Sequence, residues 1–424
     1  MSALIRSSIP GLHPIEKIPF PFPSSFVMDN GSQVYYYNDI DAEVVKIELL
    51  FSAGTTYGNS PLLARMTNSM ITAGTSTLSQ KQIAEKIDYY GAYFEKELNA
   101  DHASLTVYSL RKYVEEVLEI VTEVVNDCIF PEVELQNNLR VQRQKFLINR
   151  EKVSFLCKQK FGQLLFGDHP YGHVTELQDY DTLSREDITS FYAEHYKKRP
   201  TFLLAGKIDK SLISCLNRLF GSVNYTEEVG KSSFSEIKSI QKKEIIVKED
   251  AVQSAIRIGR ILFNKTHPDY AEMYVLNAIF GGYFGSRLMS NLREDKGYTY
   301  GVGSGISSMK DAGYFFVSTE VGAEVTAAAE KEILFELDKL RQEKVPDKEL
   351  DVVKNYLLGR LLQHTDGVFH LLDQFKSHYL FGLTEKHFQQ NVHSIREVSS
   401  DRLLDLAQQY FGVAGFSTVI AGKM

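Results

Sequence analysis

Tryptophan is absent from this chain of 424 residues, and cysteine occurs only three times, at Cys128, Cys157 and Cys215. An odd number of cysteines without a C-x-x-C pair argues against a disulfide framework and against a cysteine-rich metal site. We therefore expect three small buried thiols, which is how free cysteines usually behave in proteins.

Long apolar runs and long basic runs are also missing. No segment approaches the roughly 18 apolar residues of a membrane span, and prolines interrupt the first residues before a stretch of signal-peptide length is complete. The formal net charge is −7, so nucleic acid and acidic membrane surfaces are poor candidate partners. We expect a cytoplasmic protein that binds neither nucleic acid nor membranes.

The chain has the material for a large core and for more than one domain. Hydrophobic residues make up 43% of the sequence and charged residues 24%, as in ordinary globular proteins. A length of 424 residues exceeds that of one ordinary domain. The abundant phenylalanine and tyrosine fit core packing as well as a peptide-binding chamber, so they predict no function.

Three features of the first half recur in the second half, in the same order and at nearly the same separation. Each half has a helical segment introduced by a proline, then a helical segment ending near a tyrosine, then an apolar run that reaches Ala-Gly-Lys. The pairs are Pro131 and Pro346, Tyr196 and Tyr410, and residues 205–207 and 421–423. Such agreement indicates an internal repeat, so both halves should share one topology.

Within each half the strands come first and the helices follow. Residues 44–54 and 255–263 have the β-branched and apolar composition of half-buried strands, and Asn30-Gly31 marks the turn of an N-terminal hairpin. Ser79 precedes a segment with helical spacing. This order predicts an α+β fold of two homologous halves, each a mixed, mostly antiparallel sheet with helices on one face.

Composition also places the boundary between the halves. Residues 224–243 are rich in serine, lysine and glutamate and lack periodicity, which is typical of a linker. We therefore predict an N-terminal domain at residues 1–223, a linker at residues 224–243 and a C-terminal domain at residues 244–424.

The first half resembles the pitrilysin/insulinase family of zinc peptidases, which includes mitochondrial processing peptidase. The resemblance begins at MDNGSQVYYYND and runs through LLFSAGTTYGNSPLLARMTNSMITAGT. It implies a clamshell of two halves. It also implies that an inverted zinc motif, H-x-x-E-H, should stand just before Gly74-Thr75.

The residues at the motif positions are Arg65, Asn68 and Ser69, and the family's third ligand, a glutamate on a later helix, matches Asn149 best. A catalytic zinc needs three neutral or anionic ligands and an open water position. Arginine is permanently charged, and an asparagine amide cannot act as the general base. Glu151 lies two residues beyond Asn149, but one carboxylate does not rebuild the site. The sequence therefore predicts no metal and no cofactor in this chain.

Histidines elsewhere offer no replacement site. Neither H-x-x-E-H nor H-E-x-x-H occurs among the 11 histidines. His169 and His173 are four residues apart, but Pro170 and Gly172 place them in a turn, where this spacing does not direct both rings at one ion. We expect this loop to be structural.

The second half keeps a different part of the family's machinery. Its segment FGGYFGSRLMSNLREDKGYTYGVGS is similar to the family segment that runs through S-R-L and L-R-E to G-x-x-Y. The resemblance assigns Arg293 and Tyr300 to the family's arginine–tyrosine pair, which stabilises the tetrahedral oxyanion of peptide hydrolysis. Arginine is a fixed cationic donor, and the tyrosine hydroxyl is a neutral one. The structural alternative is a surface salt bridge and a tyrosine packed at the start of a strand.

Three glycines, Gly281, Gly282 and Gly285, precede this pair at the place where non-catalytic subunits of processing peptidases carry a longer glycine-rich substrate loop. Glycine lets a backbone approach an extended peptide closely. A tight turn between two helices explains these glycines equally well. Substrate binding by this segment is therefore one of two interpretations.

The resemblance implies a non-catalytic subunit of a heterodimeric zinc metalloendopeptidase. A homologous partner would hold the zinc, and this chain would contribute Arg293 and Tyr300 in trans, together with half of a chamber for the peptide substrate. The alternative is an inert structural or peptide-binding scaffold of the same fold, like core subunits of respiratory complexes. A scaffold has no use for the arginine–tyrosine pair, which favours the subunit interpretation.

Overall fold

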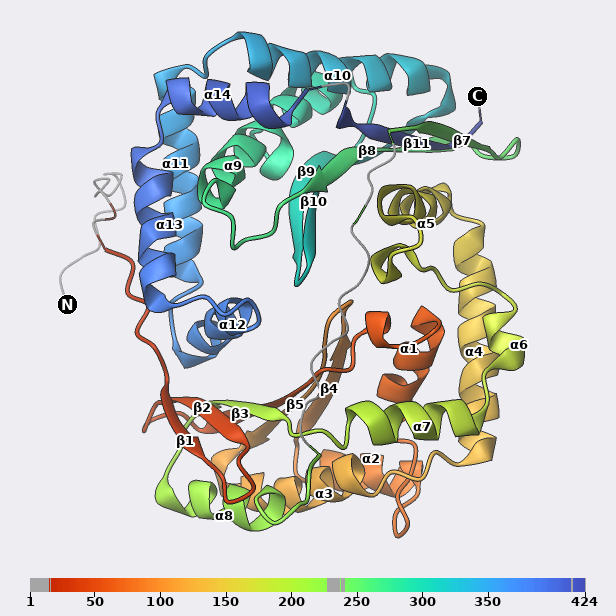
Figure 1. Cartoon of the computed structure of the whole chain (residues 1–424), viewed down its shortest axis with the longest axis vertical. Coiled ribbons are helices and arrows are strands. Elements are labelled where there is room, and N and C mark those ends of the chain that lie inside the picture. The colour runs from red at the N-terminus through yellow and green to blue at the C-terminus, as the bar shows by residue number, and fades with distance from the viewer. Residues whose placement is uncertain (1–14, 16, 227–236, 238–240, 413–414, 424) are drawn as a thin grey trace, which may run out of the picture.

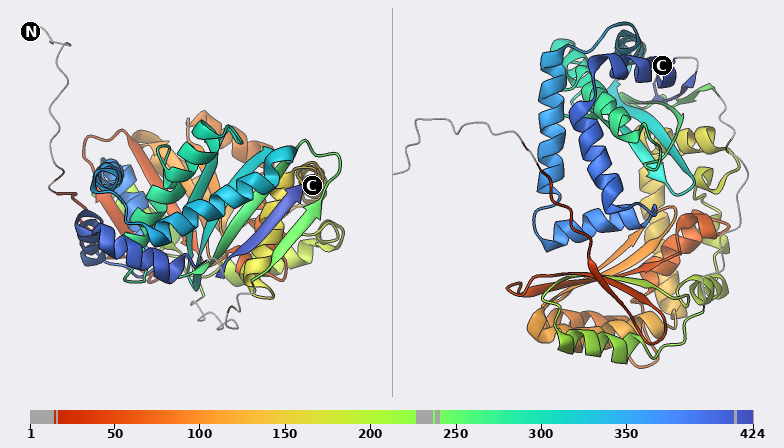
Figure 2. Two further views of the ribbon diagram at one scale, coloured as in Figure 1. Left: turned by 90° about the horizontal axis from the view of Figure 1, so that it is seen from above. Right: turned by 60° about the vertical axis from the view of Figure 1, so that its left-hand side comes forward.

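The computed structural model describes residues 15, 17–226, 237, 241–412 and 415–423, which form two halves, each built on one sheet. The halves lie one above the other in Figure 1, with the N-terminal half below. The right-hand view of Figure 2 shows the two sheets toward opposite ends of the molecule, each with helices on its outer side. This arrangement confirms the predicted fold class.

The N-terminal half follows the predicted order, with strands early and most helices later. Its strands are β1 (Ser24–Val27), β2 (Gln33–Asn38), β3 (Val44–Phe51), β4 (Tyr93–Leu98), β5 (Ala103–Leu110) and β6 (Thr201–Gly206). Its α-helices are α1 (Pro61–Met70), α2 (Gln80–Tyr89), α3 (Val114–Asn126), α4 (Glu132–Arg150), α5 (Val153–Phe166), α6 (Asp179–Thr182), α7 (Arg185–His195) and α8 (Lys210–Phe220). Short 3₁₀ turns are η1 (Thr55–Tyr57), η2 (Arg111–Tyr113) and η3 (Pro170–Gly172).

The C-terminal half has a closely matching order. Its strands are β7 (Lys243–Val247), β8 (Gln253–Leu262), β9 (Val302–Met309), β10 (Ala312–Gly322) and β11 (Ser417–Gly422). Its α-helices are α9 (Tyr270–Asn277), α10 (Thr326–Gln342), α11 (Asp347–Gln363), α12 (Val368–Tyr379), α13 (Glu385–Glu397) and α14 (Ser400–Tyr410). It also contains the π-helical segments η4 (Ala278–Gly282) and η5 (Met289–Asp295) and the 3₁₀ turn η6 (Ala323–Val325).

Apart from β1, which extends the first sheet to six strands against five in the second, the two sheets have the same strand order. It is β1-β2-β6-β3-β5-β4 in the first half and β7-β11-β8-β10-β9 in the second. In each sheet the last strand in the sequence makes a parallel pair with an early strand, β6 with β2 and β11 with β7, and the central pairs are antiparallel. Both closing strands end at a glycine of positive φ, Gly206 at 120° and Gly422 at 153°. An internal repeat predicts this shared order.

Local signals in the sequence set the ends of several elements. β1 and β2 form the predicted hairpin, with Gly31 at a φ of 85° in the turn. Ser79 caps α2, because its side chain accepts from the backbone of Gln82 while the Gln82 side chain accepts from the backbone of Ser79. Pro131 and Pro346 directly precede α4 and α11.

Alternation along β3 divides its side chains between the two faces of the N-terminal sheet. Val45, Ile47 and Leu49 are buried in an outer core that they share with side chains of α1, α3, α7 and α8. Lys46 and Glu48, between them, contact α12 on the inner face. One strand therefore carries an apolar face and a face with buried charges.

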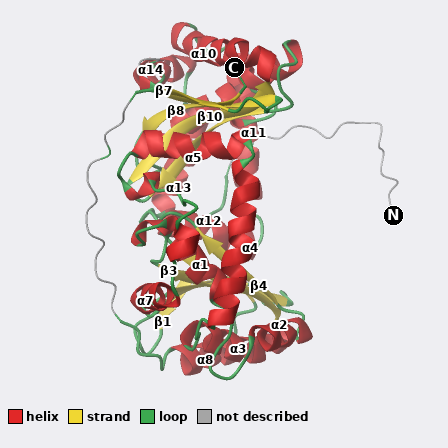
Figure 3. Cartoon of the chain, turned by 90° about the vertical axis from the view of Figure 1, so that its right-hand side faces the viewer, coloured by secondary structure: helices red, strands yellow, loops and turns green. Residues whose placement is uncertain are grey.

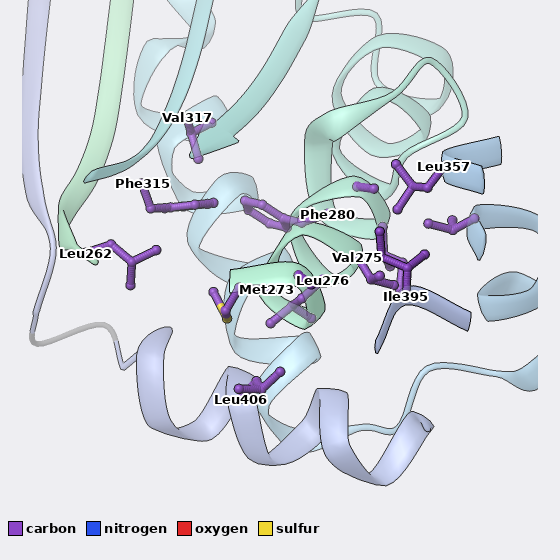
Figure 4. Close-up of a cluster of buried hydrophobic side chains, with 14 of the residues drawn as sticks. Leu262, Met273, Val275, Leu276, Phe280, Phe315, Val317, Leu357, Ile395 and Leu406 are labelled. Carbon is purple, nitrogen blue, oxygen red and sulfur yellow. The ribbon is translucent and has the colours of Figure 1, made fainter. Parts of the chain in front are cut away.

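The C-terminal half has its own large core between the sheet and the outer helices. Figure 4 shows Phe280 and Phe315 directed toward one another, and their ring centroids are 6.0 Å apart. Leu276 and Leu406 lie in the same cluster, from α9 and α14. This core fixes the start of the η4 segment, because Phe280 belongs to it.

Each half covers part of the other half's sheet. α5, from the N-terminal half, packs on β8 and β11, whereas α12, from the C-terminal half, packs on β2 and β6. The long helices α4 and α11 precede these two helices and lie on opposite sides of the molecule (Figure 1), and Figure 3 shows α4 running between the halves. Each sheet thus has helices of its own half on its outer face, as predicted. Its inner face is covered by a helix of the other half, α12 on the N-terminal sheet and α5 on the C-terminal sheet.

The cysteines behave as predicted. All three are free and buried. Cys157 of α5 lies against β11, with its sulfur 3.2 Å from the carbonyl oxygen of Val419. Burial raises the pKa of the Cys128 and Cys157 thiols to about 12, so both stay protonated at neutral pH.

Buried charges tie α12 to the inner face of the N-terminal sheet. Lys376 of α12 forms ion pairs with Glu48 of β3 and, at 3.0 Å, with Glu97 of β4. Asp373, one turn earlier, pairs with Lys46. Burial by itself would lower the pKa of Lys376, but Glu48 and Glu97 outweigh it and raise this pKa. The exchanged helix is thus held by charge as well as by apolar contacts.

The predicted linker lies mostly outside the described residues. At its start, Tyr225 packs on the N-terminal half and its hydroxyl donates to Asn126 at 3.2 Å. At its end, β7 begins at Lys243. Among the described residues, no helix combines the length and apolarity needed to cross a membrane.

We predict that Lys376→Met lowers the free energy of unfolding by roughly 3 kcal/mol, because it leaves the buried Glu48 carboxylate without its ion-pair partner. Urea unfolding of the purified chain measures this loss. Adding Glu48→Leu to the same chain should recover much of it. Lys81→Met, which breaks the exposed pair with Glu85, is the control and should change stability by less than about 0.5 kcal/mol. An equal effect of both lysine substitutions would contradict the assignment.

His378 should make the fold sensitive to mild acid. Burial lowers the pKa of this histidine to about 4 against an ordinary value of 6.5, and nearby Lys265 and His387 act in the same direction. The unfolded chain therefore binds a proton more readily, so stability is complete above pH 6.5 and falls as the pH drops toward 4. The loss should be about 2 kcal/mol at pH 5, and the variant His378→Leu should lack it. Unfolding curves at pH 7 and pH 5 test this, and equal pH dependence in both proteins would refute it.

Candidate functional site

Three of the four zinc-motif positions line one cavity of about 530 Å³. Arg65 and Ser69 come from α1, and Asn149 comes from the end of α4. A spacing of four residues puts Arg65 and Ser69 on the same face of their helix. The structure therefore brings together the residues at the three positions that carry metal ligands in the resembling family.

Asn68 is instead part of the core and is 4% exposed. Its Nδ2 donates to the carbonyl oxygen of Glu97 at 3.1 Å, and its Oδ1 accepts from the Tyr196 hydroxyl at 2.9 Å. Burial raises the pKa of Tyr196, so this hydroxyl stays protonated and remains a donor. Asn68 thus satisfies a fully buried tyrosine, a structural role for which its amide is well suited.

The groups at this cavity do not suit a zinc ion. The guanidinium of Arg65 reaches into the cavity and donates to the Thr175 hydroxyl at 3.2 Å. The ammonium of Lys96 donates to the Ser69 carbonyl at 2.6 Å, and Lys152 donates to the Asn149 side chain at 3.0 Å. These cations would repel a divalent ion. Within the part of the chain that the structure describes, no group of three or more His, Cys, Asp or Glu is placed to hold a metal.

Asn149 is the better match for the third ligand position. It lines the cavity with Arg65 and Ser69. Glu151 does not line it and pairs instead with Lys248, next to β7, at 2.8 Å. The carboxylate nearest in sequence is therefore engaged elsewhere.

The histidine pair of the 167–173 loop has a structural role. His169 is 4% exposed, and its Nδ1 accepts from the backbone of Tyr171 at 3.1 Å, which caps η3. His173 is exposed at the cavity wall. The two rings form no metal-binding group with other side chains of the described residues, and the capping bond supports the expected structural loop.

In the C-terminal half, the segment between α9 and β9 is held by motif residues. Two π-helical segments, η4 and η5, flank Ser286-Arg287-Leu288. Arg287 makes a two-point contact with Glu349 of α11, with nitrogen–oxygen distances of 2.9 and 2.8 Å. Leu288 and Leu292 are fully buried. The S-R-L and L-R-E residues therefore fix this segment to the core, and η5 presents Arg293. π-Helical turns are frequent at functional sites.

Arg293 and Tyr300 are both accessible. The Arg293 guanidinium lies over the ring of Phe284, 4.8 Å from its centroid. Tyr300 is 94% exposed. Its backbone is nevertheless fixed, because Thr299 beside it bonds to the carbonyl oxygen of Glu320 in β10 at 2.7 Å. Neither the salt bridge nor the packed tyrosine of the structural alternative is present among the described residues.

The three glycines differ in their surroundings. Gly281 is buried, and a Cβ there would lie 2.6 Å from the Ser304 hydroxyl and 2.8 Å from its backbone nitrogen, so glycine allows β9 to pack closely. A Cβ at Gly282 would lie 2.9 Å from the Asn277 side chain. Gly285 is exposed beside Phe284. A Cβ at Gly285 would also lie 2.9 Å from the Tyr283 ring, so contacts within the chain bear on all three glycines. Substrate binding stays a prediction, and Gly285 is the exposed one of the three.

Sequence reasoning missed two groups of residues. The first is Phe284, whose ring lies under the Arg293 guanidinium. Its position between Gly282 and Gly285 was the only sequence feature that could have pointed to it. The cations of the cavity, Lys145, Lys158 and Arg257, gave no signal because they come from α4, α5 and β8, which meet only in the folded protein.

Two family models match this chain, one after the other along the sequence. Residues 33–158 match the insulinase (peptidase family M16) model, and residues 182–357 match the model of the peptidase M16 inactive domain. The two models describe one family and together span more than half of the chain. The chain belongs to peptidase family M16. With arginine, asparagine and serine at the zinc-motif positions, it is an M16 homologue of the inactive type.

Similar M16 proteins occur in several bacteria. The uncharacterized zinc protease of Rickettsia felis is 27% identical over 406 residues, which cover 93% of this chain and 96% of that relative. The non-peptidase homolog YmxG of Helicobacter pylori is 21% identical over 378 residues, covering 86% and 85%. The crystal structure of a peptidase M16 inactive domain from Pseudomonas fluorescens has a TM-score of 0.87 at 23% identity and covers 95% of this chain and 98% of that chain. That structure shows the shared fold.

We predict that the purified M16 homologue holds no stoichiometric zinc, and that the triple variant Arg65→His, Ser69→His and Asn149→Glu gains about one zinc per chain. The three positions line one cavity, and Asn68 is left unchanged because Tyr196 depends on it. Metal analysis after dialysis measures both outcomes.

The double variant Arg65→His and Ser69→His is the matched control, because it keeps Glu151 but lacks the carboxylate introduced at position 149. It should bind zinc much more weakly than the triple variant. Equal binding by both would show that Glu151, not Asn149, is the equivalent of the third ligand. Tight zinc in the unaltered chain would contradict the inactive assignment.

Proposed function

We propose that this M16 homologue is the non-catalytic subunit of a heterodimeric zinc metalloendopeptidase, to which it contributes Arg293 and Tyr300 in trans. The observation that carries this proposal is the state of Tyr300. Its backbone is anchored to β10 through Thr299, while its side chain is 94% exposed. A tyrosine held in this way serves no packing purpose within its own chain.

Arg293 supports the same proposal. Its guanidinium lies over the face of Phe284, which restricts its motion without consuming its hydrogen-bond donors. Donors that are oriented before the reaction need little reorganisation when charge develops on the substrate. Arg293 and Tyr300 would thus donate to the oxyanion that forms when a peptide carbonyl is attacked.

A partner chain is required because the cavity at Arg65 and Ser69 does not suit zinc. We infer that a homologous M16 subunit with an intact H-x-x-E-H motif supplies the metal and the general base. This chain would supply the two donors and one wall of the chamber for the peptide substrate, with Gly285 near the substrate.

We also infer that the two halves arose by duplication, with domains at residues 1–223 and 244–424 joined by residues 224–243. The shared strand order and the matching glycines, Gly206 and Gly422, support this interpretation. Exchange of α5 and α12 between the sheets means that neither domain completes its inner face alone.

We predict that Arg293→Ala and Tyr300→Phe each lower the turnover of the heterodimer on the order of a hundredfold, as removal of one oxyanion donor does in other enzymes. The loss should lie mainly in kcat, because the bond is made to charge that develops in the transition state. Arg293→Lys should have little more turnover than Arg293→Ala, since an ammonium lacks the planar donor geometry of a guanidinium. Steady-state kinetics of the copurified complex measures these effects.

Lys296→Ala is the matched control, because it removes a cation three residues from Arg293 that pairs with Glu332 at 3.5 Å. Its turnover should be normal. Size-exclusion chromatography must show that every variant still assembles. Normal turnover of assembled Arg293→Ala and Tyr300→Phe complexes would leave the inert scaffold as the function of this chain.

A further inference from the structure

The cavity at the zinc-motif positions is bounded by elements from both halves. Its walls come from α1, α4 and α5, from the loop after η3, and from strands of the C-terminal sheet. Figure 3 shows α1, α4 and α5 together on this side of the molecule. Its volume, about 530 Å³, is in the range of sites that bind small molecules or short peptide segments.

The charge of this cavity is opposite to that of the chain. Arg65, Lys145, Lys158 and Arg257 line it, and none of the described residues on its walls is an aspartate or glutamate. The whole chain has a formal net charge of −7. Four cations at one cavity of an acidic protein form a local field that favours an anion.

These four cations have no anionic partner among the described residues. Arg65 donates only to the neutral Thr175, and Arg257 lies over the ring of Phe316, 5.4 Å from its centroid. Lys145 and Lys158 make no ion pair within the described part of the chain. The cavity therefore concentrates positive charge that the protein itself does not neutralise.

The nearby carboxylate of Asp101 is already engaged. It accepts from the Tyr171 hydroxyl at 2.7 Å and from the backbone nitrogen of Lys310 at 2.9 Å. Tyr171 lines the cavity, whereas Asp101 does not. Asp101 therefore does not take up the charge of the four cations, and the local field favours an incoming anion.

The uncharged part of the lining argues for a peptide over a small anion. The lining includes several aromatic rings and two glutamine side chains. These residues are Phe146, Phe155, Phe161, Phe166, Tyr314, Gln142 and Gln159. Apolar walls suit the side chains of a peptide, and amides suit its backbone, whereas free phosphate uses neither.

We propose that this cavity binds a peptide segment that carries glutamate or aspartate side chains. The peptide nature of the ligand rests on the proposed function, whereas its acidity rests on the charges of the cavity. Arg65 and Arg257 present planar donors that match a carboxylate at two points, and the exposed Lys145 and Lys158 add attraction. Acidic peptides are then the substrate class that this subunit selects.

Fluorescence anisotropy with the isolated full chain tests this without a partner. Three otherwise identical peptides, with a neutral dye and with Glu, Gln or Lys at the same positions, serve as probes. The Glu peptide should bind about tenfold or more tightly than the Gln peptide, and the Lys peptide should not bind. Raising the salt concentration should weaken binding of the Glu peptide more than binding of the Gln peptide.

Arg65→Gln and Arg257→Gln should each weaken binding of the Glu peptide about tenfold and leave the affinity for the Gln peptide unchanged. Lys86→Gln, an exposed cation on α2 outside the cavity, is the control and should change nothing. Circular dichroism confirms the fold of each variant. The proposal is overturned by equal binding of Glu and Gln peptides, by an equal effect of Lys86→Gln, or by displacement of the peptide with inorganic phosphate at matched concentration.

Peptide binding to the isolated chain and turnover by the complex are separate readouts. Loss of turnover in Arg293→Ala together with no preference for the Glu peptide would refute the acidic-peptide site and keep the subunit function. Selective binding of the Glu peptide with normal turnover in Arg293→Ala would keep the site and make the chain a peptide-binding scaffold.

Discussion

The exchange of one helix between the halves is the constraint on which the rest of this structure depends. β3 places Lys46 and Glu48 on the inner face of its sheet, and α12 from the other half supplies Asp373 and Lys376 to meet them. Buried charges are tolerable only when they are paired. The N-terminal half thus cannot bury this face by itself. The same dependence holds in the opposite direction, where Phe161 of α5 lies against Gly259 of β8.

Because the halves complete each other, elements of both halves enclose the space between them. α5 contributes both to the cover of the C-terminal sheet and to the wall of the cavity at Arg65. The cavity is therefore a product of the exchange and not of either half. Changes that loosen α5 or α12 should act on ligand binding as well as on stability, because one set of side chains serves both.

The two segments of this chain that resemble the family's machinery differ in how their side chains are engaged. At the metal position, Arg65 reaches the cavity and Asn68 has become a partner of the buried Tyr196, so the site carries cations and a core hydrogen bond instead of ligands. At the donor position, Arg287 and Thr299 still hold the segment that presents Arg293 and Tyr300. The proposed donation to a substrate in trans rests on this combination of an exposed tyrosine side chain and an anchored neighbouring residue.

The sequence by itself determined the local structure. The Asn30-Gly31 turn, the Ser79 cap and the prolines before α4 and α11 act over a few residues, so they could be recognised without a fold. The missing zinc ligands were equally plain, because the motif is contiguous in the chain. Tertiary structure alone decided the helix exchange and the charge of the cavity. Both join residues that are far apart in sequence, such as Arg65 and Arg257, and no local periodicity records which distant side chains will share one space.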